Sequence, residues 1–269
     1  MIAAIAVVVP ARNEQRLIGA CLASIHRATQ HPDVRTLPVT VVVAADSCRD
    51  RTAQIARRHG AEILKTESRS AGASRALGTA YALELARAGD RTPAAEQVWL
   101  AHTDADTQVP GSWLADQLAH AAAGAHAVTG RVQVHDWGGH TSETAGRFLH
   151  HYDYDSGDSA RAHPDPRNQQ RAHSHVHGAN LGVRADAYLA VGGFPDLAVG
   201  EDHALISALE AAHYRVRAST DTPVTTSARR DPRAPGGFGH FLLDLETRTT
   251  PRHDQDHDQP DTATHQKLS

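Results

Sequence analysis

Apolar and polar positions alternate in blocks along the first hundred residues. β-branched apolar runs at 5–9 and 39–45 are typical of strands buried on both faces of a sheet. Residues 14–28 carry apolar side chains at helical spacing, which predicts an amphipathic helix. Residues 52–59 predict a short helix that ends at Gly60.

The alternation continues with a strand at 61–66, a long helix at 73–88 that stops near Gly89, and a strand at 98–103. Strands and helices in this order predict a parallel sheet with right-handed crossovers. Ligands of such sheets bind beyond the carboxyl ends of the strands. We expect a site there, because polar residues follow all four strands, at 12–14, 46–50, 69–75 and 104–106.

The second half is less regular. We predict a strand at 125–134, one helix around 143–154 in a His-, Asp-, Gly- and Arg-rich stretch at 135–177, and a strand, short helix and Gly-Gly turn at 177–194. Residues 200–214 predict an amphipathic helix with acidic residues in its first turn, as the helix dipole favours. The polar end of the chain predicts disorder.

Composition narrows the class of protein. The chain has 269 residues, of which 40% are hydrophobic, so it can bury a substantial core. A net charge of −4 argues against a nucleic-acid-binding protein but leaves room for a local basic pocket. Cys21 and Cys48 lack metal-type spacing, which favours free thiols in a reducing cytoplasm. No apolar run reaches the roughly 18 residues of a membrane-spanning helix, so we expect a soluble, cytoplasmic protein.

Asp104 and Asp106 form a D-x-D pair at the end of the fourth predicted strand, without a basic residue nearby in the sequence. Crowded like charges are costly unless a cation compensates them. Mg²⁺ or Mn²⁺ takes such oxygen ligands and leaves positions for the oxygens of a diphosphate. The alternative is two solvated aspartates in an ordinary turn, because D-x-D triplets are common.

Six segments, in order, resemble a family-2 glycosyltransferase. They are "VVVPARNEQRLIGACLASI", "VVVAADSCRDRTAQIARRHGAEIL", "RSAGASRALGTAYA", "HTDADT", "HGANLGVRADAYLAVGGF" and "GEDHALISALEAA", and they span about 5–227. The resemblance implies an α/β fold of the GT-A type, with a mostly parallel central sheet flanked by helices. It also implies a nucleotide-diphosphate sugar donor, a divalent metal and an acceptor hydroxyl.

The resemblance places the donor site in the first half. Asp106 is then the direct metal ligand, while Asp104 holds the ribose or takes part in the metal site through a bound water. Asp46 would read the nucleobase, usually uracil, and Asp50 would brace the turn or cap the following helix. The other residues implied near the nucleotide are Pro10, Ala11, Arg12, Asn13, Glu14, Gly72, Arg75 and Gly78. The structural alternative for Asp46 and Arg75 is a salt bridge, either with each other or with another residue nearby.

The acceptor side follows in the second half. Glu201 and Asp202 match the family's acidic motif, in which the aspartate of inverting members is the general base; helix capping is the alternative. The segment implied to line the sugar and acceptor pocket is His177, Gly178, Ala179 and Asn180. "HSHVHG" allows a metal site, but a solvated His-rich loop is favoured. The third metal ligand and the inverting or retaining outcome stay open.

Departures from the family pattern refine the hypothesis. Ala45 stands where most members carry an aspartate, which leaves the base open although a UDP-sugar is expected. No Q-x-x-R-W segment is present, so we expect single transfer to a small or lipid-like acceptor. A sugar-phosphate nucleotidylyltransferase or a dehydrogenase would need a glycine-rich loop after the first strand, and "PARNEQR" has none. A degenerate binding module is the remaining alternative.

We therefore expect one GT-A domain over 1–245 and a disordered polar tail over 246–269. Within the domain, 1–109 would bind the nucleotide sugar and 110–245 the acceptor. The segment 135–177 would help to select the acceptor. The sequence does not identify the sugar, the acceptor or the oligomeric state.

Overall fold

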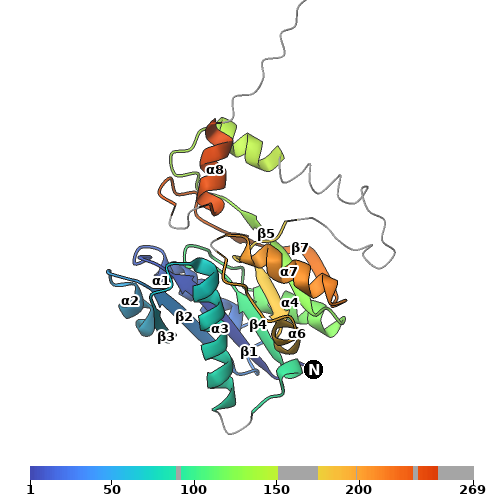
Figure 1. Cartoon of the computed structure of the whole chain (residues 1–269). Helices are drawn as coiled ribbons and strands as arrows, with labels where there is room; N and C mark the ends of the chain where they lie inside the picture. Colours follow the sequence, from blue (N-terminus) through green and yellow to red (C-terminus); the bar gives the residue numbers. More distant parts are fainter. Residues whose placement is uncertain (89–91, 151–174, 198, 233–235, 248–269) are drawn as a thin grey trace, which may run out of the picture.

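A computed structural model describes residues 1–88, 92–150, 175–197, 199–232 and 236–247. A seven-stranded sheet runs through the centre of the molecule (Figure 1). In spatial order its strands are β3 (Glu62–Thr66), β2 (Val39–Asp46), β1 (Ala4–Ala11), β4 (Val98–His102), β6 (Leu181–Arg184), β5 (Ala127–Gln133) and β7 (Val216–Thr225). Among these strands only β6 runs antiparallel to its neighbours, so the mostly parallel sheet is confirmed.

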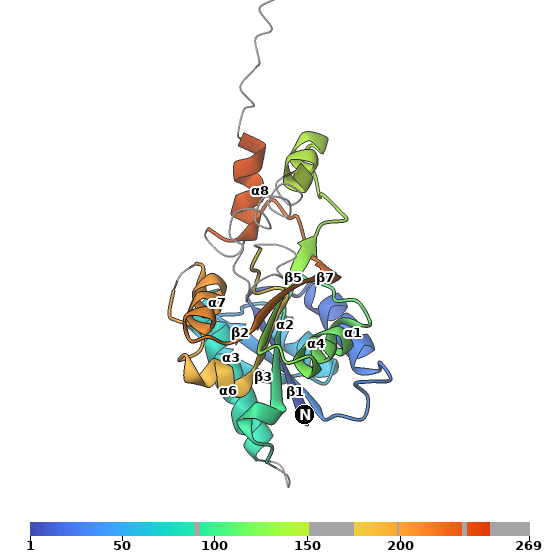
Figure 2. The same cartoon turned by 90° about the vertical axis from the view of Figure 1, so that its right-hand side faces the viewer.

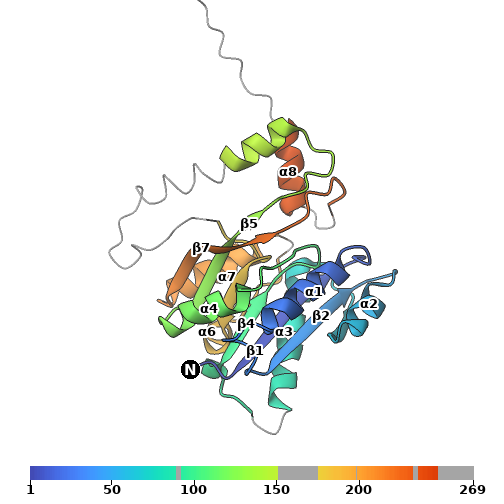
Figure 3. The ribbon, with the colours of Figure 1, turned by 180° about the vertical axis from the view of Figure 1, so that it is seen from behind.

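Helices cover both faces of the sheet, as Figures 1 and 3 show from opposite sides. One face carries α3 (Ala71–Arg87), α6 (Ala185–Ala190) and α7 (Glu201–Ala211), and the other carries α1 (Ile18–Thr29), α2 (Thr52–Arg58) and α4 (Trp113–Ala122). A 3₁₀ turn, η1 (Ala95–Gln97), leads into β4. Each face buries its own apolar cluster, which is why β1, β2 and β4 are apolar on both sides.

The predicted strands and helices of the first hundred residues are present, with one shifted boundary. Helix α1 begins at Ile18 and not at residue 14, because the preceding residues form a turn. Asn13 adopts a left-handed φ of 54°, and the amide of Glu14 donates to Oγ1 of Thr52 at 2.7 Å. Gly60 ends the α2 segment with a φ of 79°, as predicted.

A smaller part of the chain lies beyond the carboxyl ends of the strands (Figure 2). It contains α8 (Phe238–Thr247) and a helical segment at 142–150. The Arg147 guanidinium donates to the carbonyl of Leu245 at 2.6 Å, and the rings of Phe148 and Phe238 lie 5.8 Å apart. The sequence analysis did not predict α4, β7 or α8. The predicted disordered tail starts at residue 246, but Glu246 and Thr247 belong to α8, and the rest of that tail lies outside the described residues. The rest of the predicted 143–154 helix and Gly89 also lie outside them.

Within the described ranges, none of the helices combines the length and the apolar character needed to cross a membrane.

The side chain of His102, the last residue of β4, is buried, and its ring makes no hydrogen bond to the described residues. Its side chain has 0% exposure, and within the described residues neither ring nitrogen has a partner. The ring stands edge-on to Phe194, with centroids 4.9 Å apart. Burial, and secondarily the positive charge of Arg75, holds the pKa of His102 well below its ordinary value.

We predict that His102→Phe makes the protein less sensitive to acid. The unfolded chain protonates this histidine below about pH 6.5, whereas the folded protein resists it, so stability present above that pH is lost as the pH falls. Between about pH 6.5 and about pH 5 this loss amounts to about 2 kcal/mol, and the variant lacks it. Urea denaturation at both pH values measures the difference. Identical pH dependence in the two proteins would show that His102 is not held neutral.

Candidate active site

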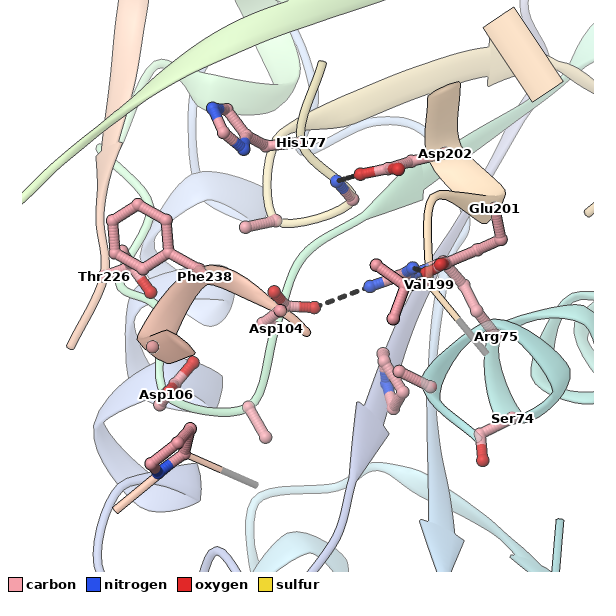
Figure 4. A pocket seen from close by; sticks show the side chains of 18 of the residues that line it. Ser74, Arg75, Asp104, Asp106, His177, Val199, Glu201, Asp202, Thr226 and Phe238 are labelled. Carbon is pink, nitrogen blue, oxygen red and sulfur yellow. Dashed lines mark hydrogen bonds and ion pairs between the residues drawn. The ribbon is translucent and has the colours of Figure 1, made fainter. Parts of the chain in front are cut away.

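A cavity of about 730 Å³ opens at the carboxyl ends of the parallel strands. Figure 4 shows side chains entering it from both halves of the chain. Most of the residues implied by the sequence line it: Pro10, Ala11, Arg12, Glu14, Asp46, Arg75, Asp104, Asp106, His177, Gly178, Ala179, Glu201 and Asp202. The convergence expected from the strand order is therefore confirmed.

The turns after β1 and β2 brace each other at one side of the cavity. Oδ1 of Asn13 accepts a hydrogen bond from the amide of Arg49 at 2.9 Å. Asp50 accepts from the amides of Thr52 and Gln15 at 2.9 and 3.1 Å, which matches its predicted bracing role. Asp46 is buried, and its Oδ1 accepts from the amide of Arg69 at 3.0 Å. Asp46 is thus held by backbone and not by the alternative salt bridge with Arg75.

Arg75 joins the two halves of the cavity. Its guanidinium is buried and donates to Oδ1 of Asp104 at 2.7 Å and to Oε1 of Glu201. Figure 4 shows it between these carboxylates. It also lies 5.6 Å from the ring centroid of Phe194. The pairing fixes the start of α7 against the D-x-D segment.

Two glycines make this arrangement possible. A Cβ on Gly178 would lie 2.5 Å from Cζ of Arg75, and a Cβ on Gly72 would lie 2.8 Å from Cγ of Glu201. Any larger residue would collide with the ion pair. Gly72 therefore does not line the cavity, and its role is to let Glu201 approach α3.

Asp106 has a different arginine partner. Nη2 of Arg229 lies 2.7 Å from Oδ2 of Asp106, and Nη1 lies 2.7 Å from Oε1 of Glu14. Burial raises the pKa of Asp106 to about 7; Arg229 opposes this rise, while Asp104 and Glu14 add to it. The sequence analysis did not identify Arg229. It lies in "SARRDPR", shortly after β7. The pair of adjacent arginines is the only local feature of the sequence that could have indicated a cation for the acidic site.

Asp202 lies in the first turn of α7 on the cavity wall. Its Oδ2 accepts from the amide of Gly178 at 2.8 Å, and its Oδ1 accepts from the amide of His203 at 2.8 Å. Figure 4 shows the first of these bonds next to His177. Two amides orient the carboxylate, and within the described part of the chain no arginine forms an ion pair with it, so its geometry suits a proton acceptor.

Asn180 corrects one prediction. Its side chain does not line the cavity but is buried inside the fold. Oδ1 accepts from the indole of Trp113 at 2.9 Å, and Nδ2 donates to the carbonyls of Arg131 and Thr222 at 3.0 and 2.9 Å. The side-chain amide of Asn180 is therefore engaged in hydrogen bonds within the fold, and its role is structural. Asn13 also lies outside this cavity and borders a second depression beside Glu14.

The donor atoms fit a hard cation that is shared with a substrate. Among the described residues no three His, Cys, Asp or Glu side chains form a ready-made metal cage. Asp104 and Asp106 nevertheless present carboxylate oxygens to the cavity, and Mg²⁺ commonly takes one or two carboxylates together with substrate phosphates. His177 stacks on His175, with centroids 6.1 Å apart, and stands edge-on to Phe238.

Comparison with known proteins gives one family. A family model described as glycosyl transferase family 2 matches residues 6–188. Curated protein sequences gave no match to this chain.

Several solved structures share the fold. S. aureus TarS 1-349 in complex with UDP-GlcNAc has a TM-score of 0.58 at 15% identity, over 90% of this chain and 64% of TarS 1-349. The mannosyltransferase PcManGT from Pyrobaculum calidifontis, in complex with GDP-Man and Mn²⁺, has a TM-score of 0.58 at 19% identity, over 87% of this chain and 59% of its own. Mannosyl-3-phosphoglycerate synthase from Rubrobacter xylanophilus has a TM-score of 0.53 at 16% identity, over 90% and 72%. The chain thus spans less than two thirds of the first two proteins.

We predict that Asn180→Ala destabilises the fold without removing the nucleotide site. The substitution leaves the Trp113 indole and two carbonyls without their partner, and we expect a loss of about 3 kcal/mol in the free energy of unfolding. Chemical denaturation measures it, and nucleotide affinity measured below the unfolding transition should change less than about threefold. If the variant kept its stability but bound nucleotide more weakly, Asn180 would instead be a residue of the binding pocket.

Proposed function

Because the chain belongs to glycosyltransferase family 2 and has the GT-A fold, we propose that it transfers a sugar from a nucleotide-diphosphate donor to an acceptor hydroxyl. One observation carries the proposal. The turn at 10–14, the D-x-D pair and Asp202 come from separate segments yet line one cavity. In this arrangement the first 109 residues supply the donor side, and 110–245 supply most of the acceptor side.

The donor's base would lie beside Asp46. This carboxylate is oriented by the amide of Arg69 and lines the cavity together with Pro10, Ala11 and Arg12. A fixed acceptor oxygen suits a ring N–H, which uracil offers, so we propose a UDP-sugar. UDP-GlcNAc and GDP-Man are the ligands of the two structurally similar proteins named above, and Ala45 leaves both bases to be compared.

Asp106 and Asp104 would hold Mg²⁺ or Mn²⁺ against the diphosphate. When bound, such a cation stabilises the negative charge that develops on the departing nucleotide. Arg75 keeps Asp104 turned toward the cavity through its 2.7 Å contact, so this carboxylate needs little rearrangement to meet a ribose hydroxyl or a metal-bound water. The metal assignment rests on oxygen donors at the correct end of the sheet.

Asp202 would act as the general base of an inverting reaction. Its carboxylate is fixed by two amides and can take the proton of an acceptor hydroxyl as that oxygen attacks the anomeric carbon. Glu201 is buried against Arg75, so we assign it a positioning role for α7 and not proton transfer. Both residues also favour the helix start, so the capping alternative and the catalytic one are compatible.

The second half of the chain contributes apolar side chains to the cavity, on the proposed acceptor side. The lining on this side includes Val176, Val199, Phe238 and Phe241, together with the ring of His177. An acceptor with an apolar portion would remove these surfaces from water at a gain of about 25 cal/mol per Å². We therefore propose a small-molecule or lipid-like acceptor.

We predict that Asp202→Asn lowers kcat by about 10²- to 10⁴-fold, because the amide cannot accept the acceptor's proton. Donor affinity should stay within about threefold, since Asp202 lies on the acceptor side of the cavity. The assay is release of nucleoside diphosphate from several nucleotide sugars with an acceptor panel. Asp116→Asn, which changes an aspartate in the first turn of α4 outside the cavity, is the control. Full activity of Asp202→Asn would refute the assigned base.

We predict that removal of divalent ions abolishes transfer and that Mn²⁺ restores it. Asp106→Asn should lower the activity at saturating Mn²⁺ by about two orders of magnitude, because one direct oxygen ligand is lost. Release of nucleoside diphosphate in the presence and absence of a chelator measures both effects. Transfer that persists unchanged with chelator would contradict the metal role. Nucleotide binding without turnover across donors and acceptors would favour a binding module.

A further inference from the structure

The guanidinium of Arg229 contacts the carboxylate of Asp106, the residue proposed as the direct metal ligand. It bridges Oδ2 of Asp106 at 2.7 Å and both carboxylate oxygens of Glu14, at 2.7 and 2.8 Å. Asp106 and Glu14 are largely buried, whereas the Arg229 side chain is 24% exposed. The carboxylate proposed as metal ligand is therefore already compensated by a cation that belongs to the chain.

The fold holds Arg229 in this place. The backbones of Gln108 and Thr225 exchange hydrogen bonds at 2.8 and 2.9 Å, so the segment after Asp106 is paired with the end of β7. Oγ1 of Thr107 donates to Oγ1 of Thr226 at 3.0 Å, and Ala228 is buried in the core. These contacts bring position 229 next to Asp106. The contact is thus built into the sheet edge.

The neighbouring arginine shows that the placement is specific. Arg230 turns away from the cavity and binds Oε1 of Glu246 at 2.8 Å and the carbonyl of Gly139 at 3.1 Å. Two consecutive arginines therefore serve different parts of the molecule. Arg230 gives a control of the same residue type and almost the same position in the chain.

In the absence of nucleotide, the binding of a dication to Asp106 would be unfavourable. The dication would have to displace Arg229, which would break the ion pair of Arg229 with Glu14, or accept a positive neighbour at close range. A nucleoside diphosphate changes this balance. It brings phosphate oxygens as further ligands and negative charge that compensates both the dication and the guanidinium.

We propose that Arg229 is the resident counter-ion of the metal site, which keeps divalent ions off Asp106 until a nucleoside diphosphate brings them in. Metal and donor then bind as a unit, and the empty protein carries no dication. This inference rests on the proposed function, because it concerns the same carboxylates. It adds a residue of the second half of the chain, and an order of binding, to that function.

The test is a Mn²⁺ titration without nucleotide, followed through the electron paramagnetic resonance signal of free Mn²⁺. Wild type and Arg230→Gln should bind Mn²⁺ weakly and equally, whereas Arg229→Gln should bind it at least about tenfold more tightly. Arg229→Lys keeps the charge but loses the forked geometry and should fall between them. Adding Asp106→Asn to Arg229→Gln should remove the gain. With UDP or GDP present, the wild type should take up Mn²⁺ together with the nucleotide.

The outcomes separate the two proposals. Equal Mn²⁺ affinity of wild type and Arg229→Gln, both folded by circular dichroism, would overturn the counter-ion role while leaving metal dependence intact. A wild type that takes up no Mn²⁺ with any nucleoside diphosphate would instead remove the metal from the proposed function. If Arg229→Gln does not fold, Arg229→Lys decides, and an affinity equal to the wild type would also overturn the inference.

Discussion

The structure depends on compensating a concentration of negative charge at one edge of a sheet. Glu14, Asp104, Asp106 and Glu201 all line the same cavity, and carboxylates this close repel one another unless cations lie between them. Arg75 bridges Asp104 and Glu201, and Arg229 bridges Glu14 and Asp106. Each arginine joins carboxylates from different segments. The same contacts therefore balance the charge of the site and fix the two halves of the fold together.

The need to compensate these negative charges also constrains the backbone around the cavity. The ion pair of Arg75 needs Gly72 and Gly178, because a Cβ at either position would collide with it. The amide of Gly178 then orients Asp202, so the proposed base is placed by backbone that packs closely against Arg75. A site assembled in this way loses little free energy to reorganisation when the substrate binds, which is the physical basis of electrostatic preorganisation.

Local pattern was enough to predict the strands of the sheet except β7, most helices and the strand-end position of the site, since periodicity and strand order act within short stretches. It could not reveal Arg229, whose partners lie 123 and 215 residues away in the sequence. Asn180 was wrongly assigned to the pocket, because a motif gives position but not side-chain direction. Residues of β7 alternate imperfectly and include Pro223, which hides the strand, whereas the helical spacing of α4 was there to be recognised.

Arg75 and Arg229 carry the same charge but differ in how deeply they are buried and in what surrounds them. Arg75 is buried between Asp104 and Glu201 and stacks near Phe194, so its removal would leave buried charge uncompensated. Arg229 is partly exposed and belongs to the connection between β7 and α8, the helix that brings Phe238 and Phe241 to the acceptor side. The proposed counter-ion of Asp106 is thus attached to the segment that carries Phe238 and Phe241 to the same cavity. Under the proposed function, charge exchange at the diphosphate and the geometry of the acceptor side would be linked through this connection.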